Sequence, residues 1–460
     1  MDASVRGCAG RSALGTAVVV GLVSIGLVPL GASAQRVPDA RALGVPLTGT
    51  PGPNNAITDV AGVEVGHSTI IEGEGRLVVG QGPVRTGVTA ILPRGRSAGD
   101  SVFAAWFSLN GNGEMTGTTW IEHSGIMVSP ILITNTHSVG VVRDAVIDWK
   151  RRRDPSFLWA LPVVAETYDG DLNDINGFHV TPEHAFEALD GGRGGPVEQG
   201  AVGGGTGMIC HYFKGGIGSA SRRVGEYTIG VLVQCNQGAR RDLRIAGLPV
   251  GEMIPEPTLC YADRSVPEEE RWPGIEWCDE TSGGGGDAEG DGSGGNDSIE
   301  GGGLGSLGAG EDGSLETGGS GRPRGPRPDG LGSIIIVLAT DAPLLPNQIK
   351  RLVTRTSLGL ARIGGMGYNG SGDIFIGFST ANRAAAATTD AVVGLEMLPN
   401  DRINPLISAS VHATEEAILN AMLAAETVVG ANGFTAPALP HDRLQEIMER
   451  YARLTEGGGG

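Results

Sequence analysis

The bond between Gly332 and Ser333 joins two segments of opposite character. A proline- and glycine-rich coil, RPRGPRPDGLG, ends at Gly332, and the apolar run SIIIVLATDAP begins at Ser333. Cleavage of this bond would leave Ser333 with a hydroxyl and a free α-amine, whose pKa of about 7.7–8.0 suits a base near neutral pH. Glycine before the serine tolerates the unusual dihedral angles of a scissile bond. The residues alone allow two interpretations, an N-terminal nucleophile or the plain beginning of a strand.

Blocks of sequence spread along the chain carry a family signature. They are NAITDVAGVEVGHSTI (Asn55–Ile70), GVTAILPRG (Gly87–Gly95), NGNGEMTGTTWIEHSG (Asn110–Gly125), NTHSVGVVRDAV (Asn135–Val146), VVAETYDGDLNDING (Val163–Gly177), GAVGGGTGM (Gly200–Met208), VLVQCNQG (Val231–Gly238), GSIIIVLATDAPLLPNQIKRL (Gly332–Leu352) and NGSGDIFIGFSTAN (Asn369–Asn382). In this order they resemble the aminopeptidases of the DmpA type, the self-processing family that also contains the β-aminopeptidases. One departure from that pattern is an acidic, Gly-rich insert before Ser333 that is longer than the family norm.

The resemblance implies a role for each matching side chain. Ser333 resembles the nucleophile that self-cleavage after Gly332 sets free. Tyr168 in ETYDG and Asn236 in QCNQG resemble the donors that stabilise the oxyanion, and their O–H and N–H groups are of the type such a site needs. Without the resemblance, core packing or hydrogen bonding at a strand end would be the simpler role for Tyr168, Asn236 and Glu166.

Three further residues receive roles from the same comparison. Ser371 in GSGD resembles a second serine that orients Ser333 or shuttles its proton, and Asp373 occupies the position of a supporting carboxylate, where some relatives carry Glu. Glu166 resembles the carboxylate that binds the free α-amine of the substrate. An aminopeptidase needs such a group to distinguish a chain terminus from an internal amide.

The activity that the resemblance implies is hydrolysis by a serine aminopeptidase that cuts itself at Gly332–Ser333 and forms an acyl-enzyme on Ser333. The expected substrates are short peptides, amides or esters with a free amino end, including those with D- or β-residues. The expected fold is a four-layer α/β/β/α sandwich like that of N-terminal-nucleophile hydrolases but with different strand connectivity. No metal or organic cofactor is expected, and the processed units are expected to form a homo-oligomer.

Two alternatives remain open at this point. One is an acyltransferase, because the ornithine acetyltransferases share a similar self-processing architecture, although they use threonine where this chain has Ser333. The other is a binding protein that keeps the fold without catalysis. An aminolysis assay with an amine acceptor would separate the first alternative from a hydrolase.

Composition narrows the classes of partner. The chain has 460 residues with a net charge of -18 and 78 Gly, and the acidic balance argues against a nucleic-acid binder, which needs a basic face.

The segment 279–331 holds 20 Gly and 11 acidic residues among 53, so it cannot bury enough apolar surface to offset its ordering entropy. We therefore predict a linker over 279–332 between two parts of one catalytic domain, 35–278 and 333–460.

The N-terminus predicts export. Arg6 and Arg11 precede the apolar stretch 13–30, and Ala32-Ser33-Ala34 matches a signal-peptidase site. We expect a signal peptide over 1–34, no stable membrane association after its removal, and a periplasmic or secreted protein. A membrane anchor is the alternative, because the apolar stretch is long enough to span a bilayer.

An exported protein permits disulfides. Cys260 and Cys278 flank a Pro- and Glu-rich loop and are the expected pair. Cys210 and Cys235 lie in apolar runs and are expected to be free, buried cysteines.

Local patterns predict the elements that must position these residues. Short apolar runs bounded by Gly, Pro or Asn predict strands at 87–93, 102–109, 131–134, 161–166, 227–234, 333–343 and 373–380. Apolar periodicity and capping predict helices at 138–151, after Thr181-Pro182, and at 347–362, 414–428 and 441–453. Such a mixture implies sheets covered by helices.

Overall fold

The computed structural model describes residues 40–96, 101–279, 332–383 and 392–457. The expected signal peptide and all but the two ends of the expected linker lie outside the described residues, so those boundaries stay predictions. The described residues belong to one compact unit that spans 37–460. Within them, no helix combines the length and the apolar character that crossing a membrane requires.

Two large sheets form the centre of this unit. The strands of the first sheet are β1 (Glu64–Glu72), β2 (Val84–Leu92), β5 (Ile131–Asn135) and β6 (Val163–Thr167). The strands of the second are β3 (Val102–Gly111), β4 (Ile126–Met127), β9 (Gly216–Val224), β10 (Tyr227–Asn236), β12 (Gly332–Thr340) and β13 (Ser371–Ser379). Their spatial orders are β1-β2-β5-β6 and β4-β3-β13-β12-β10-β9.

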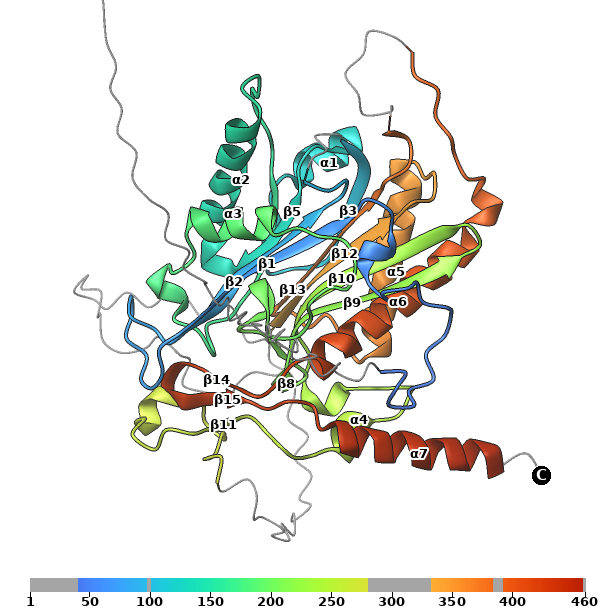
Figure 1. Ribbon diagram of the computed structural model, residues 1–460. Coiled ribbons are helices and arrows are strands. Elements are labelled where there is room, and N and C mark those ends of the chain that lie inside the picture. Colours follow the sequence, from blue (N-terminus) through green and yellow to red (C-terminus); the bar gives the residue numbers. More distant parts are fainter. Residues whose placement is uncertain (1–39, 97–100, 280–331, 384–391, 458–460) are drawn as a thin grey trace, which may run out of the picture. The chain divides into compact units, whose positions relative to one another are not determined.

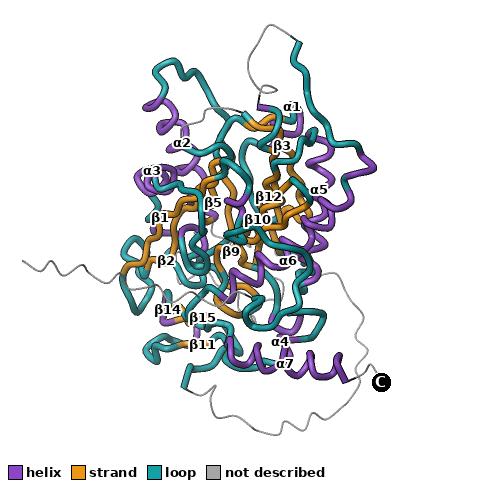
Figure 2. Tube along the Cα trace, turned by 45° about the vertical axis from the view of Figure 1, so that its right-hand side comes forward, coloured by secondary structure: helices purple, strands orange, loops and turns teal. Residues whose placement is uncertain are grey.

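Helices cover the outer face of each sheet. Helices α2 (Val139–Arg153) and α3 (Pro182–Asp190) pack on the first sheet, and α5 (Pro346–Arg362) and α6 (Asn404–Leu423) pack on the second. Both views of the chain place the strands between these two helix pairs (Figure 1, Figure 2). Three apolar clusters fill the spaces between successive layers. The expected four-layer α/β/β/α sandwich is confirmed.

Strand β12 shows why the second sheet sits in the middle of the stack. Ile334 and Ile336 belong to the apolar cluster that faces α5 and α6, whereas Ile335 and Val337 belong to the cluster between the two sheets. Successive side chains of a strand point to opposite faces, so a strand covered on both sides is apolar at every position. The unbroken run after Ser333 follows from this double burial.

Smaller elements surround the sandwich. They are α1 (Thr118–Ser124), α4 (Val250–Met253), α7 (His441–Gly457), β7 (Ile209–Cys210), β8 (Phe213–Lys214), β11 (Cys260–Tyr261), β14 (Val428–Val429) and β15 (Phe434–Ala436). Strands β11, β15 and β14 form a small sheet, and β7 pairs with β8. Figures 1 and 2 both place α4, α7 and the small sheet at the same end of the molecule, below the two large sheets.

Two sequence predictions are wrong. Helix α6 begins at Asn404, ten residues before the predicted start at 414, with Pro405 in its first turn. Cys210 and Cys235 are not free, because they form a disulfide across a sequence separation of 25. Their burial was predicted correctly, but apolar neighbours give no information about which cysteine lies opposite. The Cys260–Cys278 disulfide is present as expected.

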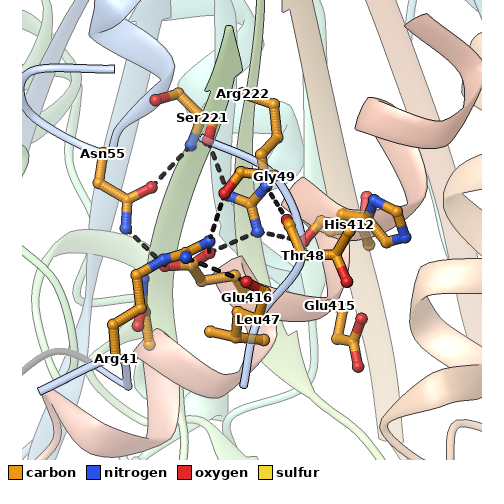
Figure 3. A network of polar contacts seen from close by, with 12 residues as sticks. Arg41, Leu47, Thr48, Gly49, Asn55, Ser221, Arg222, His412, Glu415 and Glu416 are labelled. Atoms are coloured by element: carbon orange, nitrogen blue, oxygen red, sulfur yellow. Dashed lines mark hydrogen bonds and ion pairs between the residues drawn. The ribbon is translucent and has the colours of Figure 1, made fainter. Parts of the chain in front are cut away.

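A buried ionic network ties the start of the described chain to α6 (Figure 3). Glu416 in α6 is fully buried, and its carboxylate lies 2.5 Å from the guanidinium of the buried Arg222 on β9. Arg41 and Asn55 donate to the same carboxylate at 3.0 and 2.7 Å. The network therefore joins residues 41–55 to strand β9 of the second sheet and to helix α6 of the outer layer.

Candidate active site

Ser333 lies where three central strands end together. Strand β12 runs antiparallel to β10 and parallel to β13, and the Cα partners of Ser333 in those strands are Asn236 and Gly372. The C-terminal end of β10 therefore meets the N-terminal ends of β12 and β13. Ser333 is 6 % exposed, and its Oγ accepts a hydrogen bond of 3.2 Å from the main-chain N–H of Gly372.

Gly332 has a backbone conformation that requires glycine. Its φ is +144°, and a Cβ added to it would lie 2.2 Å from the carbonyl oxygen of Asn236. Other residues rarely adopt such a positive φ. The residue before Ser333 is thus constrained both by its dihedral angle and by the strand beside it.

Ser371 and Asp373 stand on the same face of β13, because residues two apart in a strand point the same way. The Ser371 hydroxyl donates to Asp373 Oδ2 at 2.7 Å and accepts a hydrogen bond of 3.1 Å from the side-chain amide of Asn110. Burial raises the pKa of Asp373. Ser371 and Asp373 flank Gly372, the strand neighbour of Ser333, so the second serine and its carboxylate lie at the same strand ends.

The side chain of Asn236 is held at both ends. Its Oδ1 accepts a hydrogen bond of 2.7 Å from the main-chain N–H of Ile209, and its Nδ2 donates to the carbonyl oxygen of Tyr168 at 2.8 Å. An amide nitrogen carries two hydrogens, so the Tyr168 carbonyl engages one of them. These two bonds fix which end of the amide presents donors.

Tyr168 follows β6 and is 47 % exposed. Its ring folds over Gly170, where an added Cβ would lie 2.3 Å from the phenol oxygen. Tyr168 contacts the site through its main-chain carbonyl, which accepts the hydrogen bond from Asn236 Nδ2. The role of its hydroxyl stays a prediction.

Glu166 at the end of β6 is buried, with 3 % exposure. Its carboxylate accepts hydrogen bonds from the main-chain N–H of Glu114 at 2.9 Å and from the hydroxyl of Thr136. Burial raises the pKa of Glu166 above its ordinary range. A Cβ added to Gly113 would lie 3.2 Å from Gly372 Cα and 3.3 Å from Glu166 Oε1, so one glycine separates this carboxylate from the residue that contacts Ser333.

The structure thus gathers Ser333, Ser371, Asp373 and Asn236 at one end of the second sheet and brings Glu166 close to them. Partners that the sequence analysis did not single out are the main-chain N–H groups of Gly372 and Ile209 and the side chains of Asn110 and Thr136. The first two have no sequence signature, whereas Asn110 and Thr136 lie inside the NGNGEM and NTHS blocks. Among the described residues, no group of three or more His, Cys, Asp or Glu side chains could hold a metal ion.

This arrangement can support acyl transfer to a serine. It offers a buried hydroxyl, a second serine linked to a carboxylate, an oriented amide donor and a separate carboxylate able to bind a cation. Ser333 and Asn236 are opposite residues of an antiparallel strand pair, so the hydroxyl that would attack and the amide that would bind the oxyanion lie on the same face of the sheet.

Comparison with known proteins agrees with this geometry. The model of the family described as "Peptidase family S58" matches residues 55–436. The β-peptidyl aminopeptidase BapA of Sphingosinicella microcystinivorans is 48 % identical over 433 residues, covering 93 % of this chain and 96 % of that protein.

Solved structures of aminopeptidases are also similar to this chain. A β-aminopeptidase of Burkholderia sp. superimposes with a TM-score of 0.69 at 40 % identity, covering 90 % of this chain and 99 % of the other. The L-aminopeptidase D-Ala-esterase/amidase of Ochrobactrum anthropi, a prototype serine aminopeptidase with a variant of the Ntn-hydrolase fold, gives 0.70 at 41 % identity, covering 91 % and 99 %. These likenesses favour the peptidase expectation over the acyltransferase and binding-protein alternatives. The chain belongs to peptidase family S58.

Proposed function

We propose that this chain is an exported serine aminopeptidase that cuts itself between Gly332 and Ser333 and then uses Ser333 as its nucleophile. The observation that carries the proposal is the position of Ser333. It is buried at the start of the central strand β12, directly after a glycine that no other residue can replace without strain. A serine in that place gains an α-amine on cleavage, held next to its own hydroxyl.

Peptide turnover would follow from the same groups. The Ser333 hydroxyl attacks the carbonyl carbon after the first residue of the substrate, and the α-amine of Ser333 accepts the hydroxyl proton. The oxyanion that forms is stabilised by Asn236 and Tyr168, and the proton passes to the leaving amine as the C–N bond breaks. Water then attacks the ester on Ser333 and releases the acid. Ser371, supported by Asp373, orients the nucleophile.

Glu166 supports the specificity for a free amino end. A carboxylate that is held by two donors still has lone pairs for an ammonium group, and charge-assisted hydrogen bonds are the stronger kind. Relatives named for β-peptidyl substrates make short peptides or amides with an N-terminal β-residue the first substrates to test.

Export, processing and assembly belong to the same proposal. The segment 1–34 supports secretion or a periplasmic location, and the resemblance supports a homo-oligomer of cleaved units.

Denaturing mass spectrometry of the purified protein should find two chains, the smaller beginning at Ser333. The Ser333→Ala variant should remain one chain without turnover. A single intact chain that hydrolyses β-alanyl p-nitroanilide would refute the assignment of Ser333.

A further inference from the structure

Lys214 on β8 is a buried cation that the steps above leave unused. Its side chain is fully buried, and its Nζ donates to the carbonyl oxygens of Gly205, Met208 and Gly215 at 3.2, 2.7 and 2.9 Å. An ammonium group has three N–H donors, so three carbonyl oxygens match its charged form.

This placement is costly for the fold. Transfer of a charge into the protein interior is unfavourable unless it is compensated, and burial lowers the pKa of Lys214 to about 7. The hydrogen-bond partners of Lys214 Nζ among the described residues are main-chain carbonyls, which are dipoles and do not neutralise the charge. A methionine would fill the same space without a buried charge, but it would remove the donor to these three carbonyl oxygens. Hydrogen bonding accounts for the donors, whereas the buried charge invites a functional explanation.

One peptide group connects Lys214 to the active site. The carbonyl of Met208 accepts from Lys214, and the N–H of Ile209, which belongs to the same peptide plane, donates to Asn236 Oδ1 at 2.7 Å. At its other end, the Asn236 amide donates from Nδ2. Two amide groups, the Met208–Ile209 peptide and the Asn236 side chain, therefore connect the Lys214 ammonium to the Nδ2–H groups of Asn236.

Hydrogen bonds in such a chain polarise one another. A cation at the Met208 carbonyl makes the Ile209 N–H a better donor, and that donor in turn withdraws electron density from the Asn236 amide. Each step strengthens Nδ2–H as a donor to a negatively charged oxygen. The same bonds prevent the amide from turning its oxygen toward the site.

We propose that Lys214 is a positioning residue that acts through the Met208–Ile209 peptide to orient and polarise the Asn236 amide. This inference rests on the proposed role of Asn236 in binding the oxyanion. Lys214 then stabilises the transition state, in which negative charge develops on the substrate carbonyl. It contributes little to the binding of the substrate while that carbonyl is still uncharged.

The test uses Lys214→Met in the full-length protein, with Lys350→Met as the matched control. Lys350 is a partly exposed lysine that pairs with Glu122. We expect Lys214→Met to lower kcat for β-alanyl p-nitroanilide, per processed Ser333, by about tenfold or more, since complete removal of an oxyanion donor costs about 100- to 1,000-fold. KM should change less than about threefold, and Lys350→Met should leave both constants unchanged.

A double-mutant cycle with Asn236→Ala separates a specific role from a general one. If Lys214 acts through Asn236, Lys214→Met should reduce kcat by less than about twofold in the Asn236→Ala background. An equal loss in both backgrounds, or a wild-type kcat for Lys214→Met, overturns the inference. If Lys214→Met does not fold, Lys214→Gln keeps N–H donors without the charge and enters the same cycle.

The cycle also distinguishes a failure of the proposed function. Normal turnover and normal processing by Asn236→Ala would remove Asn236 from the oxyanion site, and the inference about Lys214 would fall with it. Loss of turnover in Asn236→Ala together with full turnover in Lys214→Met would overturn the inference alone and leave the proposed function in place.

Discussion

The carbonyl oxygen of Asn236 occupies the place that a side chain on Gly332 would need, since a Cβ there would lie only 2.2 Å from it. Asn236 therefore acts on the chain in two ways. Its main chain excludes any other residue before Ser333, and its side chain, anchored by Ile209 and Tyr168, offers the donor for the oxyanion. Asn236, which is expected to bind the oxyanion, therefore also constrains the backbone at the Gly332–Ser333 bond that is expected to be cleaved.

Gly332→Ala should slow self-cleavage by at least tenfold. The added methyl group would have to displace the end of β10, and alanine strongly disfavours the φ of +144° at this position. Quantification of intact and cleaved chains over time by denaturing mass spectrometry would measure the effect. Gly194→Ala is the control, because a Cβ there meets nothing within 4 Å. Equal cleavage rates for the two variants would contradict the prediction.

Glu166→Gln should weaken binding of substrates with a free amine while leaving self-cleavage intact. The amide keeps the shape of the carboxylate but not its charge, and hydrogen bonds to charged groups contribute about 1.5–3 kcal/mol. We expect KM for β-alanyl p-nitroanilide to rise by about 10- to 100-fold. Steady-state kinetics and the fraction of cleaved chain would be measured on the same sample.

The control for Glu166→Gln is Glu122→Gln, which changes an exposed carboxylate that pairs with Lys350. An unchanged KM in Glu166→Gln would remove this residue from amine recognition. A block in self-cleavage would instead assign it a role at Ser333, because the uncut bond has no free amine to recognise.

The fold was predictable from sequence where burial acts on both faces of an element. Strand β12 reads as an unbroken apolar run for this reason. Helix α5 was predicted at 347–362, one residue short of its start at Pro346. Strand β9 was missed because its Gly and Ser residues resemble a loop. Gly218 is small because α6 packs against it, and an added Cβ would lie 2.0 Å from the carbonyl of Ala417. That reason becomes visible only when the helix is in place.

The side chains of the site were predictable through the family resemblance, but the groups that hold them were not. Ser371 and Asp373 are two residues apart, so a strand alone brings them together. The donors to Ser333 and to Asn236 Oδ1 are main-chain N–H groups, and the acceptors around Lys214 are main-chain carbonyls. Any residue type supplies such groups, so no sequence pattern marks them.

Glu416→Gln should destabilise the fold far more than Glu415→Gln. Removal of the charge on Glu416 leaves the buried Arg222 uncompensated, and breaking one partner of a buried ion pair typically costs about 3–5 kcal/mol. Glu415 pairs with Arg362, which is half exposed, and pairs with an exposed partner contribute about 0–1 kcal/mol. Thermal unfolding followed by circular dichroism would compare the two variants. Similar midpoints would show that the network in Figure 3 is energetically unimportant.

Asp169 should make stability fall as pH rises. Burial raises the pKa of this fully buried carboxyl to about 7 from its ordinary value of 3.8. Between these two values the folded protein keeps a proton that the unfolded chain has lost, so the folded state binds more protons and loses stability with increasing pH. The change across this window is at most about 4 kcal/mol.

Asp169→Asn should remove this dependence. Asp169 Oδ1 accepts a hydrogen bond of 3.1 Å from Asn173 Nδ2. Asp169 Oδ2 and Asn135 Oδ1 are buried without a partner within hydrogen-bonding distance among the described residues, so the new amide can donate where a protonated carboxyl would. Unfolding midpoints measured from pH 4 to pH 8 should be flatter for Asp169→Asn than for the wild type. Parallel curves would show that Asp169 does not hold a proton in the folded state.

The order of strands in the second sheet changes the kinetics of folding once the chain is cut. Apart from Gly332, strands β12 and β13 lie after the cut, yet they are placed between β3 and β10, which both precede it. Neither fragment contains the complete second sheet, although the first sheet lies wholly in the fragment before the cut. The uncut precursor can refold in a first-order reaction at any dilution, whereas the separated fragments must first collide, and their refolding becomes second order. After self-cleavage, the rate of refolding would therefore fall with dilution, whereas the refolding rate of the uncut precursor would not depend on concentration.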